Sequence, residues 1–300
     1  RASGAIMRQE IRELLDAMGR DGYIADDAIA TAVFLAGDLG KPLLVEGDAG
    51  VGKTEIAKVV ARVRGTELIR LQCYEGLDVA TAVYEWNYPR QMLHVRMAER
   101  EGRSPAEMED EVFGKTYLLE RPLLRALTRR EGPAVLLIDE IDRADEAFEA
   151  FLLEVLSDFQ LTIPELGTIR AEHLPYVVLT SNCTREIGDA LRRRCLYLYI
   201  GHPTLEKEVR ILRSRVPGAS ERLALEIARV VAALRTRALV RSPGVAESID
   251  WALALTRLHR DALDVEVVEA TLGCVIKDRR DLRALDRAEL GRLVAEAAQS

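Results

Sequence analysis

The sequence predicts an α/β domain built on a central parallel sheet, followed by an all-helical domain. Up to about residue 200, short and almost continuously apolar runs alternate with segments of helical periodicity. This alternation is typical of a parallel sheet covered on both faces. Beyond residue 202 only helical patterns follow. We therefore expect an N-terminal segment at residues 1–22, an α/β domain at residues 23–201 and a helical domain at residues 202–300.

Five runs are the strand candidates, and helical patterns separate them. Apolar residues recur at helical spacing from Ala144 to Phe159, which predicts an amphipathic helix with Asp142 as its N-cap. Other helices are predicted from Pro122 to Gly132 and at 104–112, where Ser104 begins a capping box. The strand candidates are KPLLVE (41–46), ELIRLQCY (67–74), AVLLIDE (134–140), YVVLTSN (176–182) and LYLYI (196–200).

The composition excludes several classes of protein. With 48% hydrophobic and 30% charged residues, the chain has the composition of a soluble globular protein. No membrane insertion is expected, because no apolar run approaches the ~20 residues that cross a bilayer. No signal peptide is visible, and the residues before Met7 are expected to be foreign to the natural chain. The net charge of −7 argues against sequence-independent nucleic-acid binding.

The cysteines point to a reducing compartment. All 4 are scattered without paired spacing, so neither a disulfide framework nor a zinc site is expected. Reduced, buried thiols of a cytoplasmic protein are the simplest interpretation.

The run GDAGVGKT predicts a phosphate-binding loop. It matches G-x-x-x-x-G-K-[ST] and lies between an expected strand and an expected helix. Glycines allow successive backbone N–H groups to surround a polyphosphate, and the helix directs its positive end at the same group. Lys53 is expected to reach the β- and γ-phosphates, and the Thr54 hydroxyl to bind Mg²⁺. The expected nucleotide-binding residues are Gly47, Asp48, Ala49, Gly50, Val51, Gly52, Lys53 and Thr54.

Two acidic residues at the end of the third strand candidate predict hydrolysis. Ligands of open α/β sheets bind at the carboxyl ends of strands, which is where Asp139 and Glu140 lie. We expect Asp139 to orient the coordination shell of Mg²⁺ and Glu140 to polarise the attacking water. An acidic helix N-terminus is the alternative interpretation.

Polar residues after the next strand complete the candidate catalytic set. Asn182 is expected to hold the lytic water or a γ-phosphate oxygen, although Asn is also common in turns. The run Arg192–Arg194 indicates an arginine finger, with Arg194 as the first candidate and Arg193 as the second. Its position suits action on a neighbouring subunit. A solvated charged face is the alternative.

With these motifs in this order, the chain resembles the AAA+ ATPases, and within them the MoxR family of the helix-2-insert branch. GDAGVGKT is similar to the family's Walker A, LLIDEID to its Walker B and TSN to its sensor 1. DALRRRC is similar to the segment that carries its arginine finger. GLDVATAVYEWNYPRQM and RSPGVAESIDWALAL are similar to stretches of the group associated with carbon-monoxide dehydrogenase maturation. The resemblance extends from about Tyr23 onward.

The resemblance implies an AAA+ P-loop domain with a helical lid, using ATP and Mg²⁺. It implies insertions near residues 75–120 and 161–173 that line a pore or contact a partner. It also implies a homo-oligomer, a hexameric ring that remodels or matures a client protein. The client would be a metalloenzyme and the partner a von Willebrand A domain protein. At the family's sensor 2 position this chain has Gly244, and Arg241 is the candidate substitute.

Two other functions stay open. One is a nucleic-acid-stimulated motor, in which Arg90 and Arg96 would follow a nucleic-acid backbone. Tyr84, Trp86 and Tyr88 can be interpreted as a base-stacking strip, although packing is the commoner use of aromatic residues. The other is a switch that assembles on ATP without hydrolysing it. No N-K-x-D string follows the Walker elements, which favours ATP over GTP.

Overall fold

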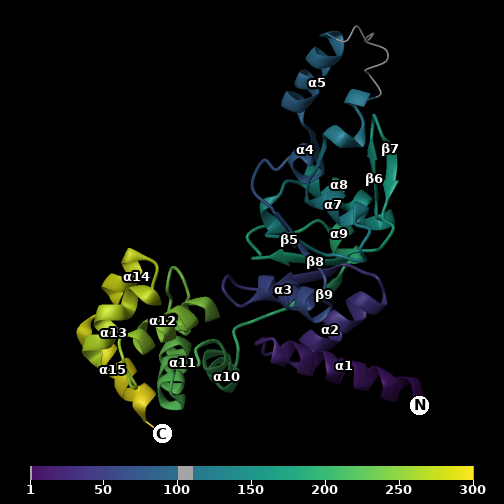
Figure 1. Cartoon of the computed structure of the whole chain (residues 1–300). Coiled ribbons are helices and arrows are strands. Elements are labelled where there is room, and N and C mark those ends of the chain that lie inside the picture. The colour runs from purple at the N-terminus through teal and green to yellow at the C-terminus, as the bar shows by residue number, and fades with distance from the viewer. Residues whose placement is uncertain (1, 101–110, 300) are drawn as a thin grey trace. The chain divides into compact units, whose positions relative to one another are not determined.

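The computed structural model describes residues 2–100 and 111–299 and divides into two compact units (Figure 1). The first unit contains the chain up to Leu14 and residues 27–46 and 57–198. The second contains residues 15–26, 47–56 and the chain from Tyr199 onward. The helix predicted to begin at Ser104 falls outside the described residues for most of its length.

A five-stranded sheet forms the centre of the first unit, which confirms the predicted fold class. The strand order is β2-β5-β8-β1-β9, and the pairs β2–β5, β5–β8 and β8–β1 are parallel. Every strand candidate supplies one strand. The strands are β1 (Leu43–Glu46), β2 (Leu68–Gln72), β5 (Val135–Asp139), β8 (Tyr176–Ser181) and β9 (Leu196–Tyr199).

Burial explains why these runs lack alternation. Every residue of β1, β5 and β8 is buried, whereas β2 at the sheet edge alternates between buried and more exposed residues. The register places Glu46 beside Ser181, and Gln72 beside Asp139. The carboxyl ends of these strands therefore meet at one edge of the sheet, where ligands of such folds bind.

Helices flank the sheet, and the start of one of them, α8 (Glu146–Asp158), differs from the prediction. α8 starts after Asp145, whose carboxylate accepts the N–H of Phe148 at 2.8 Å. The expected cap Asp142 was wrong, because its carboxylate instead accepts the N–H groups of Asn182 and Thr184. The helices are α1 (Ala2–Arg20), α2 (Asp27–Asp38), α3 (Lys53–Val63), α7 (Pro122–Thr128), η2 (Ile141–Arg143), α8 (Glu146–Asp158) and α9 (Asp189–Arg194).

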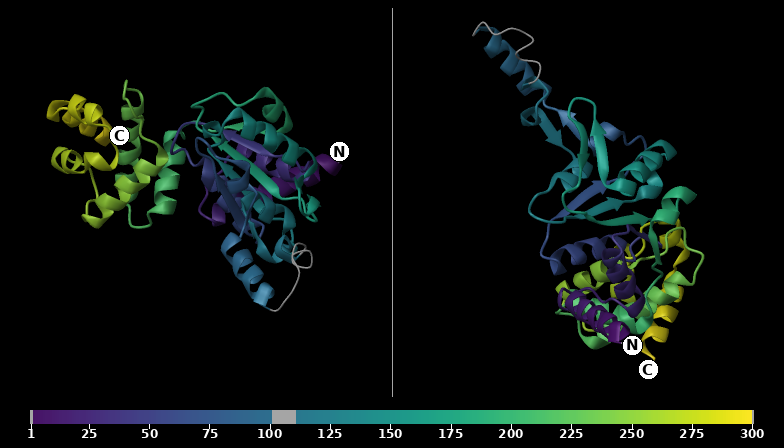
Figure 2. Two further views of the ribbon diagram at one scale, coloured as in Figure 1. Left: turned by 90° about the horizontal axis from the view of Figure 1, so that it is seen from above. Right: turned by 90° about the vertical axis from the view of Figure 1, so that its right-hand side faces the viewer.

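Two segments that do not belong to the central sheet stand on one side of it (Figures 1 and 2). The described part of residues 75–120 forms a small antiparallel pair, β3–β4, and the helix α5. Within it, Trp86 is buried with its ring edge-on to Tyr84, so these two side chains pack instead of offering a stacking strip. The second segment is the hairpin β6–β7, in which Gly167 has a φ of +76°. Their elements are α4 (Val79–Ala82), β3 (Tyr84–Trp86), α5 (Tyr88–Arg100), η1 (Lys115–Tyr117), β4 (Leu118–Glu120), β6 (Gln160–Ile163) and β7 (Gly167–Arg170).

Helices make up the described structure after residue 202, as predicted. Thr204, Ser220, Asp264 and Asp286 act as N-caps, which is why polar residues precede these helices in the sequence. The fully buried Trp251 lies at the core, and its indole N–H donates to Thr271 at 2.8 Å. The helices are α10 (Leu205–Arg215), α11 (Glu221–Arg235), α12 (Val245–Arg257), α13 (Val265–Thr271), η3 (Leu272–Cys274), α14 (Arg279–Ala284) and α15 (Arg287–Ala298).

The thiols differ from expectation in one respect. All four cysteines are free, but only Cys73 is buried, and Cys183 is exposed. The expectation of buried thiols was therefore wrong for Cys183, because the turn that contains it lies at the surface.

Among the helices of residues 2–100 and 111–299, none combines the length and apolar character needed to cross a membrane.

Candidate nucleotide-binding site

The glycines of residues 47–54 are required by the backbone of the loop. Gly47, Gly50 and Gly52 have φ values of +154°, +77° and +95°, a region that other residues rarely adopt. A Cβ on Gly47 would also lie 2.0 Å from the carbonyl oxygen of Ile200. The loop continues β1 directly and leads into α3, which begins at Lys53. The turn has the form that backbone N–H groups need to surround an anion.

The side chains of Lys53 and His202 lie against this loop. Lys53 is only 6% exposed, and its ammonium donates to the carbonyl oxygens of Gly47 at 2.8 Å and Asp48 at 2.6 Å. This places a buried positive charge at the backbone of the loop. Nε2 of His202 lies 3.5 Å from the Asp48 carboxylate. Burial, and then the charge of Arg235, lowers the pKa of His202, which keeps the imidazole neutral at pH 7.

The start of α12 packs on the glycine loop. The N–H groups of Val245 and Ala246 donate to the carbonyl oxygen of Gly50 at 3.0 and 3.3 Å. A Cβ on Gly244 would lie 2.8 Å from the carbonyl oxygen of Ala49, so only glycine fits at this contact. The Arg241 side chain is exposed, and the Arg241 N–H donates to the carboxylate of Asp281. Sequence reasoning singled out Gly244 but not its contact with the loop.

Thr180 joins the two acidic residues at the end of β5. Its hydroxyl donates to Oδ1 of Asp139 at 2.5 Å and accepts the N–H of Glu140 at 2.9 Å. Oδ2 of Asp139 pairs with Arg70 at 2.5 Å, and Asp139 is only 2% exposed. The sequence analysis included Thr180 in the motif TSN but assigned the catalytic role to Asn182, and it assigned no role to Arg70. A hydroxyl directly after the apolar run 177–179 was the available signal for Thr180.

Glu140 has a strained backbone and an accessible carboxylate. Its φ and ψ of +56° and +51° are left-handed, a conformation that costs a non-glycine residue about 1–3 kcal/mol. The side chain is 32% exposed and pairs with Arg143 at 3.0 Å. Strain of this kind is concentrated at functional sites, which supports a chemical role for the residue.

Asp142 anchors the turn that contains Asn182. Its Oδ1 accepts the N–H of Asn182 at 3.2 Å, and its Oδ2 accepts the N–H and the hydroxyl of Thr184 at 3.0 and 2.5 Å. Asn182 and the pair Asp139–Glu140 are therefore held at one edge of the sheet.

Cys73 also lies beside Asp139, and its N–H donates to the Asp139 carbonyl oxygen. Burial, followed by the charge of Asp139, raises the pKa of the Cys73 thiol to about 12.

The structure separates the three adjacent arginines. Arg192 makes two hydrogen bonds to the buried Glu46 carboxylate, at 2.6 and 2.7 Å. Arg193 is 84% exposed, with Asp189 4.0 Å away, and Arg194 is also exposed. Arg192 is thus engaged within its own chain, whereas Arg193 and Arg194 face solvent.

Asp139 and Thr54 each carry an oxygen group of the kind that binds Mg²⁺. This ion is commonly held by one or two carboxylates and the phosphates of a substrate, with several waters retained. Both Asp139 oxygens already have protein partners, so this residue suits contact with a metal-bound water better than direct coordination. The Thr54 hydroxyl, in the first turn of α3, is the direct ligand expected from the loop motif.

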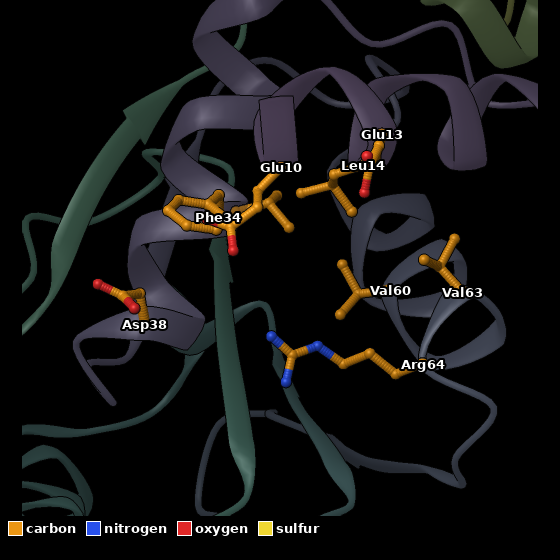
Figure 3. A pocket seen from close by; sticks show the side chains of 9 residues that line it. Glu10, Glu13, Leu14, Phe34, Asp38, Val60, Val63 and Arg64 are labelled. Atoms are coloured by element: carbon orange, nitrogen blue, oxygen red, sulfur yellow. The ribbon is translucent and has the colours of Figure 1, made fainter. Parts of the chain in front are cut away.

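Two pockets of the first unit contain none of the predicted catalytic or nucleotide-binding residues. One of about 260 Å³ lies between α1, α2 and α3 (Figure 3). Its lining combines apolar residues such as Leu14, Phe34 and Val60 with the charged residues Glu10, Glu13, Asp38 and Arg64. The other, of about 530 Å³, includes Asp142 and Thr184 and therefore adjoins the turn that contains Asn182.

Comparisons with known proteins identify the family and the fold of the chain. The sequence profile of the AAA domain family (dynein-related subfamily) matches residues 42–195, which are 154 of the 300 residues. Among curated proteins no significant sequence match was found. A point mutant of RuvB from Thermotoga maritima is 18% identical, with a TM-score of 0.50, over 87% of this chain and 70% of that chain. This likeness shows the fold.

Two further structures are similar at lower TM-scores. The RuvB Holliday junction branch migration motor of Thermotoga maritima is 19% identical, with a TM-score of 0.47, over 85% of this chain and 68% of that chain. A Cytophaga hutchinsonii protein assigned as an ATPase is 15% identical, with a TM-score of 0.49, over 94% of this chain and 86% of that chain. On the match that covers residues 42–195, the chain is an ATPase and belongs to the AAA domain family, dynein-related subfamily.

Proposed function

We propose that this protein is a Mg²⁺-dependent ATPase that works as a homo-oligomeric ring and remodels a client protein. The observation that carries the hydrolytic part is the Thr180 hydroxyl, which holds Asp139 and Glu140 together at the carboxyl edge of the sheet. The alternative is that Asp139 and Glu140 only stabilise the start of a helix. That role requires neither the strained backbone of Glu140 nor its partly exposed carboxylate.

Each residue then has a distinct task. The backbone N–H groups of residues 47–52 hold the phosphates, and Lys53 binds the β- and γ-phosphates. Glu140 orients the attacking water, and Asn182 holds that water or a γ-phosphate oxygen. Bound Mg²⁺ would neutralise charge on the phosphate oxygens. Asp139 and Thr54 would hold the ion, the former through a water.

The exposed arginines support a ring. An arginine finger that acts on the nucleotide of another subunit has to be accessible in the single chain. Arg193 and Arg194 meet this condition, whereas Arg192 is bonded to Glu46. We assign the finger to Arg194, with Arg193 as the alternative, and expect a hexamer.

The surface of α5 supports a protein client. Tyr88, Met92, Leu93 and Met97 are all exposed on this one helix. Exposed apolar groups gathered in this way mark interaction sites, and methionine adapts to varied partners. The resemblance to the MoxR family extends the proposal to a cytoplasmic protein that matures a metalloenzyme, such as a carbon-monoxide dehydrogenase, with a von Willebrand A domain partner.

The same helix favours a second candidate, a nucleic-acid-stimulated motor. Arg90, Arg96 and Arg100 are exposed on α5 beside its apolar residues and could contact phosphates. DNA or RNA that stimulated ATP hydrolysis, with stimulation falling steeply as salt rises, would favour the motor. No stimulation at any salt concentration would favour a protein client.

Substitution of Glu140 by glutamine tests the hydrolytic proposal. Glu140→Gln should bind ATP with near-normal affinity and lose turnover by ~10²-fold or more, because only the group that positions the water is changed. Calorimetric binding and phosphate release would be measured together. Glu154→Gln, an exposed change on α8, is the control and should behave as the wild type. Unchanged turnover in Glu140→Gln would instead indicate a structural glutamate, and a wild type without turnover would indicate an assembly switch.

A further inference from the structure

The Glu46–Arg192 ion pair has no task in the proposed mechanism, yet its carboxylate is buried and both of its oxygens accept hydrogen bonds from Arg192. Glu46 is 4% exposed, and one Arg192 nitrogen donates to both of its carboxylate oxygens, at 2.6 and 2.7 Å. The Arg192 guanidinium also lies 5.6 Å from the centre of the Tyr197 ring. Burial, and then a hydrogen bond with Glu46, raises the pKa of Tyr197, so this hydroxyl stays protonated beside the pair.

The position of Glu46 gives the pair its significance. Glu46 is the last residue of β1, and the next residue, Gly47, opens the glycine loop. A buried carboxylate is costly unless it is paired, and here it also lies one residue before a loop that is proposed to hold several negative phosphate charges. An unpaired Glu46 would oppose phosphate binding by like-charge repulsion, which is poorly screened away from solvent.

We infer that Arg192 is a positioning residue for nucleotide binding in its own subunit: it neutralises Glu46 and so permits the adjacent loop to bind a polyphosphate. This inference rests on the proposed phosphate-binding role of residues 47–54. It assigns different tasks to neighbouring residues of α9, because Arg192 acts within the chain while Arg194 acts on the next subunit. The guanidinium at 192 also lies by the Tyr197 ring, and a lysine ammonium lacks the planar group that packs on an aromatic ring in this way.

ADP binding tests the inference without needing hydrolysis or a ring. Arg192→Gln should weaken ADP binding by about fivefold, because an uncompensated carboxylate then precedes the loop. Adding Glu46→Gln should return the affinity to within about twofold of the wild type, because the offending charge is gone. Glu46→Gln alone should tighten ADP binding, since the charge of Arg192 is then unbalanced. This sign is measurable even if Arg192→Gln does not fold.

A matched control separates electrostatics from loss of stability. Arg185 pairs with another buried carboxylate, Glu149, which belongs to α8 and is not joined to the glycine loop by the chain. Arg185→Gln should lower the melting temperature and leave ADP affinity unchanged. Melting temperatures of all variants would be recorded, with binding measured well below them.

Three outcomes would overturn the inference. One is weaker ADP binding by Glu46→Gln, and the second is a double variant no better than Arg192→Gln. The third is normal ADP binding by Arg192→Gln with hydrolysis restored on mixing with a Lys53 variant, which would make Arg192 the finger. A protein that binds ADP but never hydrolyses ATP would refute the proposed function and leave this test intact.

Discussion

At the residue scale, the proposed chemistry depends on a few side chains that bridge others. Thr180 holds the carboxylate of Asp139 and the backbone of Glu140, and Asp142 holds the turn of Asn182. The strained φ of +56° at Glu140 persists because these bonds fix the residues around it. Small polar groups next to the catalytic candidates thus decide where the reactive groups lie.

Replacing Thr180 by valine tests this arrangement. Thr180→Val keeps the shape of the buried strand but removes the donor to Asp139 and the acceptor for the Glu140 N–H. Turnover should fall by roughly 10- to 100-fold with little change in ATP affinity, as is common for residues that orient metal-binding or catalytic groups. Steady-state kinetics and calorimetry would measure the two effects. Thr168→Val, in the exposed strand β7, is the control, and equal losses in both variants would contradict the assignment.

At the element scale, regular elements were more predictable than the contacts between them. Apolar runs located the five strands of the central sheet, and the signal was clearest for β1, β5 and β8, which are buried throughout. Helix ends were less predictable, since α7 stops at Thr128, short of the expected Gly132. The cap at Asp145 was missed because Asp142 and Asp145 both suit an N-cap, and only the tertiary bonds of Asp142 distinguish them. The loop motif was identifiable from spacing, but the Gly244 contact depends on packing between distant segments.

That contact yields a prediction for α12. Gly244→Ala would place a Cβ 2.8 Å from the carbonyl oxygen of Ala49 and 2.9 Å from the Cα of Gly50, which forces the helix start away from the loop. We expect a loss of about 1–3 kcal/mol in the free energy of unfolding, together with weaker ADP binding. Thermal denaturation and calorimetry would show both.

The control for α12 is another glycine of the helical region. Gly273→Ala adds the same methyl group where no atom lies within 4 Å, so stability and affinity should both stay close to wild type. If Gly244→Ala were as stable as Gly273→Ala and bound ADP normally, the packing of α12 on the loop would not matter for binding.

At the scale of the whole molecule, the proposed machinery is distributed between the two units. Residues 47–56, with the start of α12, belong to the second unit, while Asp139, Glu140 and the arginine run belong to the first. Lys53 is expected to serve nucleotide binding, and Asp139 and Glu140 of the first unit are expected to serve hydrolysis. A ring adds one requirement, because Arg194 would complete the site of the next subunit.

Mixing two inactive variants tests that requirement. Arg194→Ala should bind ATP and scarcely hydrolyse it, since an arginine finger contributes ~10³–10⁵ in rate. Lys53→Ala should lose ATP binding, because its ammonium is the cation placed at the loop backbone. In mixed rings some interfaces pair an intact loop with an intact Arg194, so phosphate release should recover in part and peak at an intermediate ratio.

The control uses Arg170→Ala, an exposed change on β7, in place of Arg194→Ala, and this variant should be active on its own. Subunit exchange would be verified by energy transfer between labelled chains. Exchange without any recovery, at every ratio, would show that Arg194 does not act between subunits.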